Sequence, residues 1–349
     1  MKGTTTGITV SRTDPVNGNH TMNLKLAASA LLLGIFMSLN LQAQPVKEHG
    51  KLSVQGTHLT DEHGKATVLN GVSYGWHNWW PRFYNKDCVK WLASDWKCSV
   101  VRAALGVEPK GGYIDKPDWS KEKLEAVIQG AIENDVYVII DWHSHSIKLA
   151  DAKRFFAEMA RKHGRTPNVI YELFNEPVND SWPRVKEYSI ELIKTIRAID
   201  PDNVILVGSP HWDQDIHLVA DDPIRGFSNI MYTCHFYAAT HGKFLRDRCD
   251  YAIKKGIPIF ITESAAMQAS GNGPLNLREW QKWIDWCGTN KVSLITWSIA
   301  DKDETCSMLK PSAADEGHWK NADLKDSGIK TRELLRKLSN NPTTHENAK

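Results

Sequence analysis

The stretch Asn168–Pro177, NVIYELFNEP, joins an apolar run to an acidic turn and is the best guide to the fold. Its centre, Val169–Phe174, is a short and largely apolar run of the kind that forms a strand covered on both faces. Asn175, Glu176 and Pro177 follow at once, so a carboxylate stands directly after the expected strand. Taken alone, these three residues could also begin a helix, with the asparagine as its cap.

Seven further β-rich runs occur along the chain, and amphipathic stretches lie between them. The eight runs are Leu69–Tyr74, Ser99–Ala103, Val136–Asp141, Asn168–Phe174, Asn203–Gly208, Ile230–His235, Pro258–Glu263 and Val292–Trp297. Apolar residues at helical spacing over 124–132 and 185–196 predict helices between strands. Eight strands alternating with helices over about 290 residues predict an α/β fold, a (β/α)8 TIM barrel. A doubly wound sheet would usually carry a glycine-rich phosphate turn, and this sequence has none.

The barrel is expected to form a single catalytic domain over residues 44–339. Residues 51–68 alternate around Asp61-Glu62-His63-Gly64 and predict a short N-terminal hairpin ahead of the first barrel strand. No linker rich in Pro, Ser or Gly divides this part of the sequence. The last residues, 340–349, are polar and are predicted to be a disordered tail.

The most apolar stretch of the chain is Leu26–Met37, which follows Lys25 and precedes Ala43. This order is typical of a signal peptide, and the run is too short to span a bilayer. Residues 1–43 are therefore interpreted as an N-terminal extension with a signal peptide over 22–43, translation starting at Met22. The protein is expected to be secreted or periplasmic and free of the membrane after cleavage. The alternative is a buried hydrophobic helix at the N-terminus.

Composition narrows the choice of partners. The formal net charge is only +2 at pH 7, which gives no electrostatic reason to favour nucleic acid or an anionic membrane. No dinucleotide or flavin fingerprint occurs, so no cofactor is expected, and we expect a monomer. The 14 tryptophans suit both a core and a sugar-binding cleft. The six cysteines lack zinc spacing; export would permit disulfides, and Cys88–Cys98 is the pair closest in sequence.

In a TIM barrel the working residues lie at the carboxyl ends of the strands and in the loops that follow. The polar and aromatic residues at these ends are Arg102, Asp141, His143, Asn175, Glu176, His235, Tyr237, Glu263 and Trp297. Glycoside hydrolysis needs two carboxyl groups, about 5–5.5 Å apart in retaining enzymes. Glu176 and Glu263 end the fourth and seventh strands, which face each other across a barrel. Arg102 and Tyr237 can keep Glu263 ionised, which leaves Glu176 as the proton carrier.

Several segments resemble glycoside hydrolase family 5, and most of all the bacterial endoglucanases of its cellulase branch. They are Val138–Ser144 (VIIDWHS), Asn168–Pro177 (NVIYELFNEP), Thr233–Tyr237 (TCHFY), Phe260–Glu263 (FITE) and Thr296–Ser307 (TWSIADKDETCS). The resemblance covers residues 50–338, in the expected order on the expected strands. It implies that Glu176 is the acid/base and Glu263 the nucleophile.

The resemblance also implies a set of substrate-binding residues. Asn175 would hydrogen-bond the 2-hydroxyl of the sugar at the cleavage point, and Arg102 and Tyr237 would orient the nucleophile. His143 and His235 would surround the same sugar, and Trp297 would stack beneath it. Lys302, with Glu304, would bind a sugar further along the glycone side, and Trp79 would form the aromatic floor of the glycone cleft. Many relatives carry Trp-Gly after the nucleophile, whereas this chain has Ser264-Ala265. The wall of the site beside Glu263 is therefore expected to differ.

The predicted function is a retaining endo-β-1,4-glucanase acting on cellulose-type or mixed-linkage glucans. The alternatives are a related retaining glycanase on mannan, xyloglucan or mixed-linkage glucan and, more distantly, a non-catalytic carbohydrate-binding barrel. No metal is expected, because His143, His145 and Asp141 lack further ligands at suitable spacing. His145 is interpreted as a solvated loop residue, and Glu172 as a paired carboxylate inside the barrel.

Overall fold

The computed structural model describes residues 44–340, together with Thr9, Ser11 and Arg12. The predicted signal peptide, the proposed start at Met22 and nearly all of the predicted tail lie outside the described residues. In the part of the chain that is described, no helix is long and apolar enough to cross a membrane.

Eight parallel strands close into a barrel, which confirms the predicted (β/α)8 fold. In barrel order they are β10 (Leu294–Ile299), β3 (Asn70–Tyr74), β4 (Val100–Gly106), β5 (Tyr137–His143), β6 (Val169–Glu172), β7 (Ile205–Val207), β8 (Ile230–Tyr237) and β9 (Ile259–Ala265). All eight predicted runs are strands, and most bounds differ by only a few residues. Because every strand is buried on both faces, nearly continuous apolar runs were the right signal.

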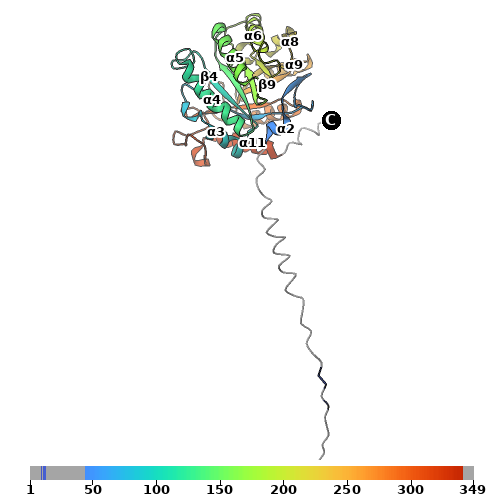
Figure 1. Ribbon diagram of the computed structural model, residues 1–349, viewed down its shortest axis with the longest axis vertical. Coiled ribbons are helices and arrows are strands. Elements are labelled where there is room, and N and C mark those ends of the chain that lie inside the picture. Colours follow the sequence, from blue (N-terminus) through green and yellow to red (C-terminus); the bar gives the residue numbers. More distant parts are fainter. Residues whose placement is uncertain (1–8, 10, 13–43, 341–349) are drawn as a thin grey trace, which may run out of the picture. The chain divides into compact units, whose positions relative to one another are not determined.

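Helices connect the strands and lie outside them, as α4, α5 and α6 show in Figure 1. The α-helices are α2 (Pro45–His49), α3 (Lys86–Trp91), α4 (Pro117–Glu133), α5 (Leu149–His163), α6 (Trp182–Arg197), α7 (Pro210–Asp213), α8 (Ile216–Asp221), α9 (Lys243–Lys254), α10 (Leu277–Asn290) and α11 (Asp326–Asn340). Three short turns of other helix types are η1 (Pro81–Phe83), η2 (Leu92–Trp96) and η3 (Asn321–Asp323). The predicted helical faces fall within α4 and α6.

The reading of Asn175-Glu176-Pro177 as a helix start is wrong. The next helix, α6, begins at Trp182 with Ser181 before it, so Glu176 lies in the loop between strand and helix. That loop is at the carboxyl ends of the strands, where a barrel carries its reactive groups.

The opposite end of the barrel is closed by apolar side chains. The predicted hairpin is present as β1 (Ser53–Gln55) and β2 (His58–Thr60), which pair antiparallel. Leu59 of this hairpin packs in one buried cluster with residues such as Ile139 and Phe260 inside the barrel. The polar interior is therefore confined to the other end, where the candidate site lies.

The structure contains no disulfide among the six cysteines, all of which lie in its described part. All six cysteines are buried free thiols, and the short distance is the 3.5 Å between the sulfurs of Cys234 and Cys249. Burial raises the pKa of the Cys88 thiol to about 12, so this thiol stays protonated and unreactive.

Candidate active site

Arg102 is the centre of the polar interior of the barrel. It is the third residue of β4 and fully buried, rather than a strand-end residue as the sequence suggested. Its guanidinium group binds Glu172 through two hydrogen bonds of 2.7 and 3.1 Å, which confirms that Glu172 is an interior paired carboxylate. It also lies 3.0 Å from Asp141 and donates to the side-chain oxygen of Asn175 at 2.7 Å. The Arg102 guanidinium group thus binds residues from two neighbouring strands, β5 and β6, and from the loop after β6.

Glu263 lies near the end of β9 and receives two hydrogen bonds. Arg102 Nη1 donates to Oε2 at 3.1 Å, and the hydroxyl of Tyr237 donates to Oε1 at 2.7 Å. With a donor on each oxygen, the carboxylate is held in one orientation, as the sequence-based model of the nucleophile required.

Glu176 lies between two imidazoles. His235 Nδ1 is 3.0 Å from Oε1, and His145 Nε2 is 3.3 Å from Oε2. Burial alone would raise the pKa of Glu176, but the hydrogen bonds with the two histidines outweigh burial and hold this pKa below its ordinary value. His145, interpreted from the sequence as a solvated loop residue, is therefore a direct neighbour of this carboxyl group.

His235 is held by partners on both ring nitrogens. Its Nε2 lies 2.8 Å from the hydroxyl of Thr262 and 3.3 Å from Asp213. Burial would lower the pKa of His235, but the carboxylates of Asp213 and Glu176 raise it to about 10. The ring is therefore an imidazolium ion that donates to Glu176 at neutral pH. A register shift between β8 and β9 falls just before this residue, a place where bulges re-aim side chains.

The carboxylates of Glu176 and Glu263 meet at the same end of the barrel. One oxygen from each, together with a ring nitrogen of His235, lie within 4.8 Å of one another. These two carboxylate oxygens and the ring nitrogen are close enough together to be ligands of one metal ion, but both carboxylates already accept hydrogen bonds from protein donors. A gap of this size fits one sugar carbon between the two carboxyl groups.

A cavity of about 420 Å³ opens beside the two carboxylates. It is lined by Glu176, His211, Trp212, Gln214, His235, Tyr237, His241, Glu263 and Ala269. Trp212 is 41% exposed and sits in a turn where three successive residues have positive φ angles of 54–59°. This turn was not predictable from sequence preferences, because none of the three residues is a glycine.

Aromatic side chains form a wall at the same end of the barrel. His143 and Trp297 are stacked with ring centroids 5.3 Å apart, and the edge of His143 meets Trp76 at 4.3 Å. Trp76 in turn lies 4.8 Å from Trp79, which is 51% exposed. The structure thus brings together three predicted substrate-binding residues and adds Trp76, which was not predicted.

Lys302 and Glu304 lie in the loop after β10 and bind each other, with 2.5 Å between Nζ and Oε2. Lys302 is half exposed, and Glu304 is mostly buried. Neither residue lines the cavity beside the carboxylates. Their predicted role would therefore concern a sugar farther from the cleavage point.

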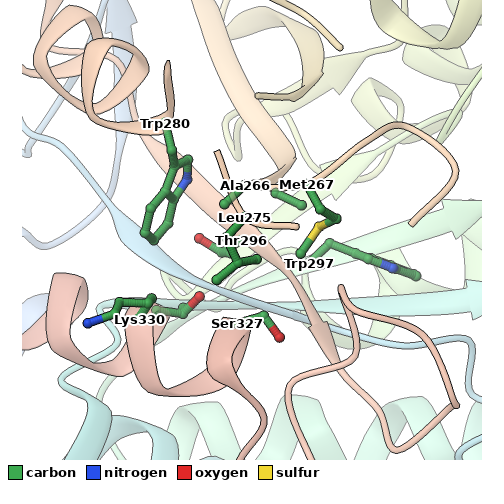
Figure 2. A pocket seen from close by; sticks show the side chains of 10 residues that line it. Ala266, Met267, Leu275, Trp280, Thr296, Trp297, Ser327 and Lys330 are labelled. Atoms are coloured by element: carbon green, nitrogen blue, oxygen red, sulfur yellow. The ribbon is translucent and has the colours of Figure 1, made fainter. Parts of the chain in front are cut away.

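A second and much smaller cavity lies behind Trp297 (Figure 2). Its volume is about 10 Å³, the size of a single water, so it is too small for a sugar. Figure 2 shows Trp280 and Lys330 on one side and the indole of Trp297 on the other. Among the described residues, neither the Thr296 hydroxyl nor the Trp280 N–H has a hydrogen-bond partner.

A barrel with two carboxylates paired in this way is the framework of a glycosidase. The family model described as cellulase (glycosyl hydrolase family 5) matches residues 60–303. The chain belongs to this family.

The relatives agree with this assignment. An endoglucanase of Clostridium saccharobutylicum is 44% identical over 287 residues, covering 80% of this chain and 64% of its own length. Endoglucanase N of Pectobacterium atrosepticum is 43% identical over 325 residues, covering 91% of this chain and 72% of its own. The chain therefore spans about two thirds of the length of these relatives.

Solved structures show the same fold. A structure from Cytophaga hutchinsonii is 43% identical with a TM-score of 0.84, covering 85% of this chain and 98% of that one. The catalytic domain of a Thermobifida fusca endoglucanase is 32% identical with a TM-score of 0.79, covering 84% of this chain and all of that one. A variant of that domain was solved with cellotetraose.

Proposed function

We propose that this protein is a retaining endo-β-1,4-glucanase that cuts internal bonds of unbranched β-1,4-glucan. The observation that supports it most is the pair of carboxylates, with oxygens within 4.8 Å of each other, at one end of the barrel. Retaining glycosidases use about 5–5.5 Å between their carboxyl groups, whereas inverting ones need about 6.5–9.5 Å. The relatives named as endoglucanases support the choice of glucan.

In the first half-reaction, Glu263 is the nucleophile. Its carboxylate attacks the anomeric carbon and forms a glycosyl ester, while the bond from that carbon to the glycosidic oxygen breaks. Glu176 gives a proton to the departing oxygen, which leaves as an alcohol. Arg102 and Tyr237, at 3.1 and 2.7 Å, keep the nucleophile ionised and aimed.

In the second half-reaction, water breaks the ester. Glu176, now a carboxylate, takes a proton from water as the oxygen attacks the anomeric carbon, and Glu263 leaves as a carboxylate. Two inversions restore the β configuration. Asn175 is positioned by its 2.7 Å bond from Arg102, and its amide N–H can donate to the 2-hydroxyl of the sugar.

The surroundings suggest how the glucan chain lies. The wall of Trp79, Trp76, His143 and Trp297 offers apolar faces for the sugars before the cut, with Lys302 and Glu304 beyond. The cavity of about 420 Å³ accepts sugars on the leaving side. Flat, unbranched β-1,4-glucan presents the apolar faces that such walls bind.

Two measurements test the proposal. Proton NMR of cellotetraose hydrolysis should show the β-anomer first, and carboxymethylcellulose should lose viscosity faster than reducing ends appear. Initial release of the α-anomer would exclude retention. A panel with mannan and xyloglucan tests the substrate, because equal or faster cleavage of either would replace glucan as the assignment.

We also propose that the protein is exported. The basis is the apolar run Leu26–Met37 after Lys25 in the sequence. N-terminal sequencing of protein from culture medium or periplasm should begin near residue 44, and a product that retains this run would contradict export by cleavage.

A further inference from the structure

His145 is placed against the acid/base by the loop that follows β5. Its Nε2 lies 3.3 Å from one oxygen of Glu176, and His235 Nδ1 lies 3.0 Å from the other. The reaction described above needs a single proton to move on and off Glu176. Two imidazoles contact that carboxyl group, those of His235 and His145, and the proposed mechanism assigns no role to His145.

Glu108 fixes the position of His145. The same oxygen, Oε1 of Glu108, accepts hydrogen bonds from the N–H of His145 at 3.3 Å and from the N–H and hydroxyl of Ser146 at 3.1 and 2.8 Å. It also accepts from the hydroxyl of Ser144, whose carbonyl oxygen in turn accepts from the N–H of Glu176 at 3.3 Å. The partly buried carboxylate of Glu108 thus binds three successive residues of the loop after β5 to the loop after β4. The backbone that carries the imidazole is therefore fixed by hydrogen bonds on both sides of His145.

The groups that face His145 are mostly acidic. Glu176 and Glu108 are the carboxylates that act on it most strongly, followed by Glu263. His143, the last residue of β5, is neutral because burial lowers its pKa, and its ring is 6.3 Å away. Asp141 also interacts electrostatically with His145, and Trp76 packs edge to face against it with 5.5 Å between ring centroids. Burial would lower the pKa of His145, but its hydrogen bond with Glu176 raises this pKa above the ordinary value.

We propose that His145 is a positioning residue for the acid/base, aligning the Glu176 carboxyl group and sharing one proton with it across their 3.3 Å contact. This inference rests on the proposed function. In the resting enzyme the proton is on Nε2 and Glu176 is a carboxylate. Transfer of the proton to Glu176 leaves a neutral imidazole, and the carboxylic acid then protonates the departing oxygen. In the second half-reaction the proton taken from water returns to Nε2.

His235 is less suited than His145 to exchange a proton with Glu176. Its pKa of about 10 means that the ring keeps its proton throughout the neutral range. Its ring is also bonded at Nε2 to Thr262 at 2.8 Å, inside the barrel. His145 is 44% exposed and can exchange its proton with solvent between turnovers. One imidazole thus holds the carboxyl group by a permanent charge, and the other supplies the mobile proton.

The test is His145→Gln, which keeps a possible hydrogen-bond donor but cannot titrate. In the wild type the pair holds its proton up to the raised pKa of His145, whereas in the variant the proton is lost at the lower pKa of Glu176 itself. The basic limb of kcat/KM for cellotetraose should therefore move to lower pH by more than about one unit, with at least about a tenfold loss at pH 7.5. Glu108→Gln, which weakens the clamp on the loop, should move the limb in the same direction by less.

An activated substrate separates proton supply from binding. The leaving group of 2,4-dinitrophenyl β-cellobioside needs no proton, so the basic limb of kcat/KM should not move on this substrate. His63→Gln, a change at an exposed histidine in the turn after β2, is the matched control and should leave both profiles unchanged.

The possible outcomes are distinct. An unmoved basic limb with cellotetraose would overturn the inference, and so would an equal loss of kcat/KM at every pH with both substrates. A wild-type enzyme that hydrolyses neither substrate would instead remove the proposed function.

Discussion

Replacing Arg102 by lysine should destabilise the protein strongly although the charge is kept. A guanidinium group has five N–H donors and an ammonium group only three. The five N–H groups of Arg102 are engaged with Glu172, Asn175, Ser73 and Glu263, and Asp141 lies 3.0 Å from Nη2. At least two contacts to buried acceptors are therefore lost.

The magnitude follows from the kind of bond. Hydrogen bonds to charged groups contribute about 1.5–3 kcal/mol each, so the loss of two lowers the free energy of unfolding by about 3–6 kcal/mol. Burial is complete at Arg102, so water cannot replace the missing donors. For a domain of this size the melting temperature should fall by roughly 10 °C.

Equilibrium unfolding in urea, followed by tryptophan fluorescence, measures this effect directly. The midpoint should fall for Arg102→Lys while the slope stays constant. The matched control is Arg184→Lys, whose side chain is 69% exposed and 3.5 Å from its acidic partner. The control should change stability by less than about 0.5 kcal/mol. If Arg102→Lys lowers the free energy of unfolding by less than about 1 kcal/mol, the reasoning is refuted. The positive charge alone, without the five N–H donors of the guanidinium group, would then be enough to stabilise the site.

Three further predictions concern separate parts of the molecule. Tyr237→Phe removes the 2.7 Å bond to Glu263 and should lower kcat about 10–100-fold with little change in melting temperature; unchanged steady-state turnover would contradict it. Thr296→Val removes a buried hydroxyl without a partner in the described structure and should raise the free energy of unfolding by about 1 kcal/mol in urea titrations, whereas a decrease would show that the hydroxyl is satisfied. Burial would raise the pKa of Glu125, but hydrogen bonds from His163 and its neighbours lower it to about 2. Since this folded-state pKa is depressed, Glu125→Gln should cost stability at pH 6, and the difference from wild type should shrink as pH falls from about 4.5 toward 2; a pH-independent difference would oppose this.

The strands were predictable because their signal is local. A strand covered on both faces must be apolar almost throughout, so eight such runs could be counted without knowing how they pair. The position of Glu176 and Glu263 followed from the rule that reactive groups lie at the carboxyl ends of barrel strands. Their partners in the polar interior are less local. Arg102 was expected at a strand end because a charged residue within a buried strand is costly until Glu172 and Asp141 arrive from the next strands.

His145 and Trp212 could not be placed from the sequence for a related reason. The backbone N–H of His145 donates to Glu108, which lies 37 residues earlier in the chain, and no sequence pattern at either residue indicates this contact. Trp212 faces the cavity because three successive non-glycine residues adopt positive φ angles, a conformation that sequence preferences oppose. Loops at a barrel mouth obtain their shape from contacts across the site, and these contacts exist only after the barrel has closed.

Glu176 and Glu263 are bound by cations of different kinds, and the double displacement proposed above explains why. As the proposed nucleophile, Glu263 must be ionised at the start of each cycle, and its cationic partner, Arg102, cannot release a proton at any working pH. As the proposed acid/base, Glu176 must gain and lose a proton in every cycle, and its cationic partners are imidazoles, which can release a proton. The hydroxyl of Thr262 joins the two halves, since it donates to Glu172 at 2.8 Å and accepts from His235 at 2.8 Å. If arginine stood in place of His145, the acid/base would be aligned equally well but held permanently as a carboxylate, and the first half-reaction would lack its proton.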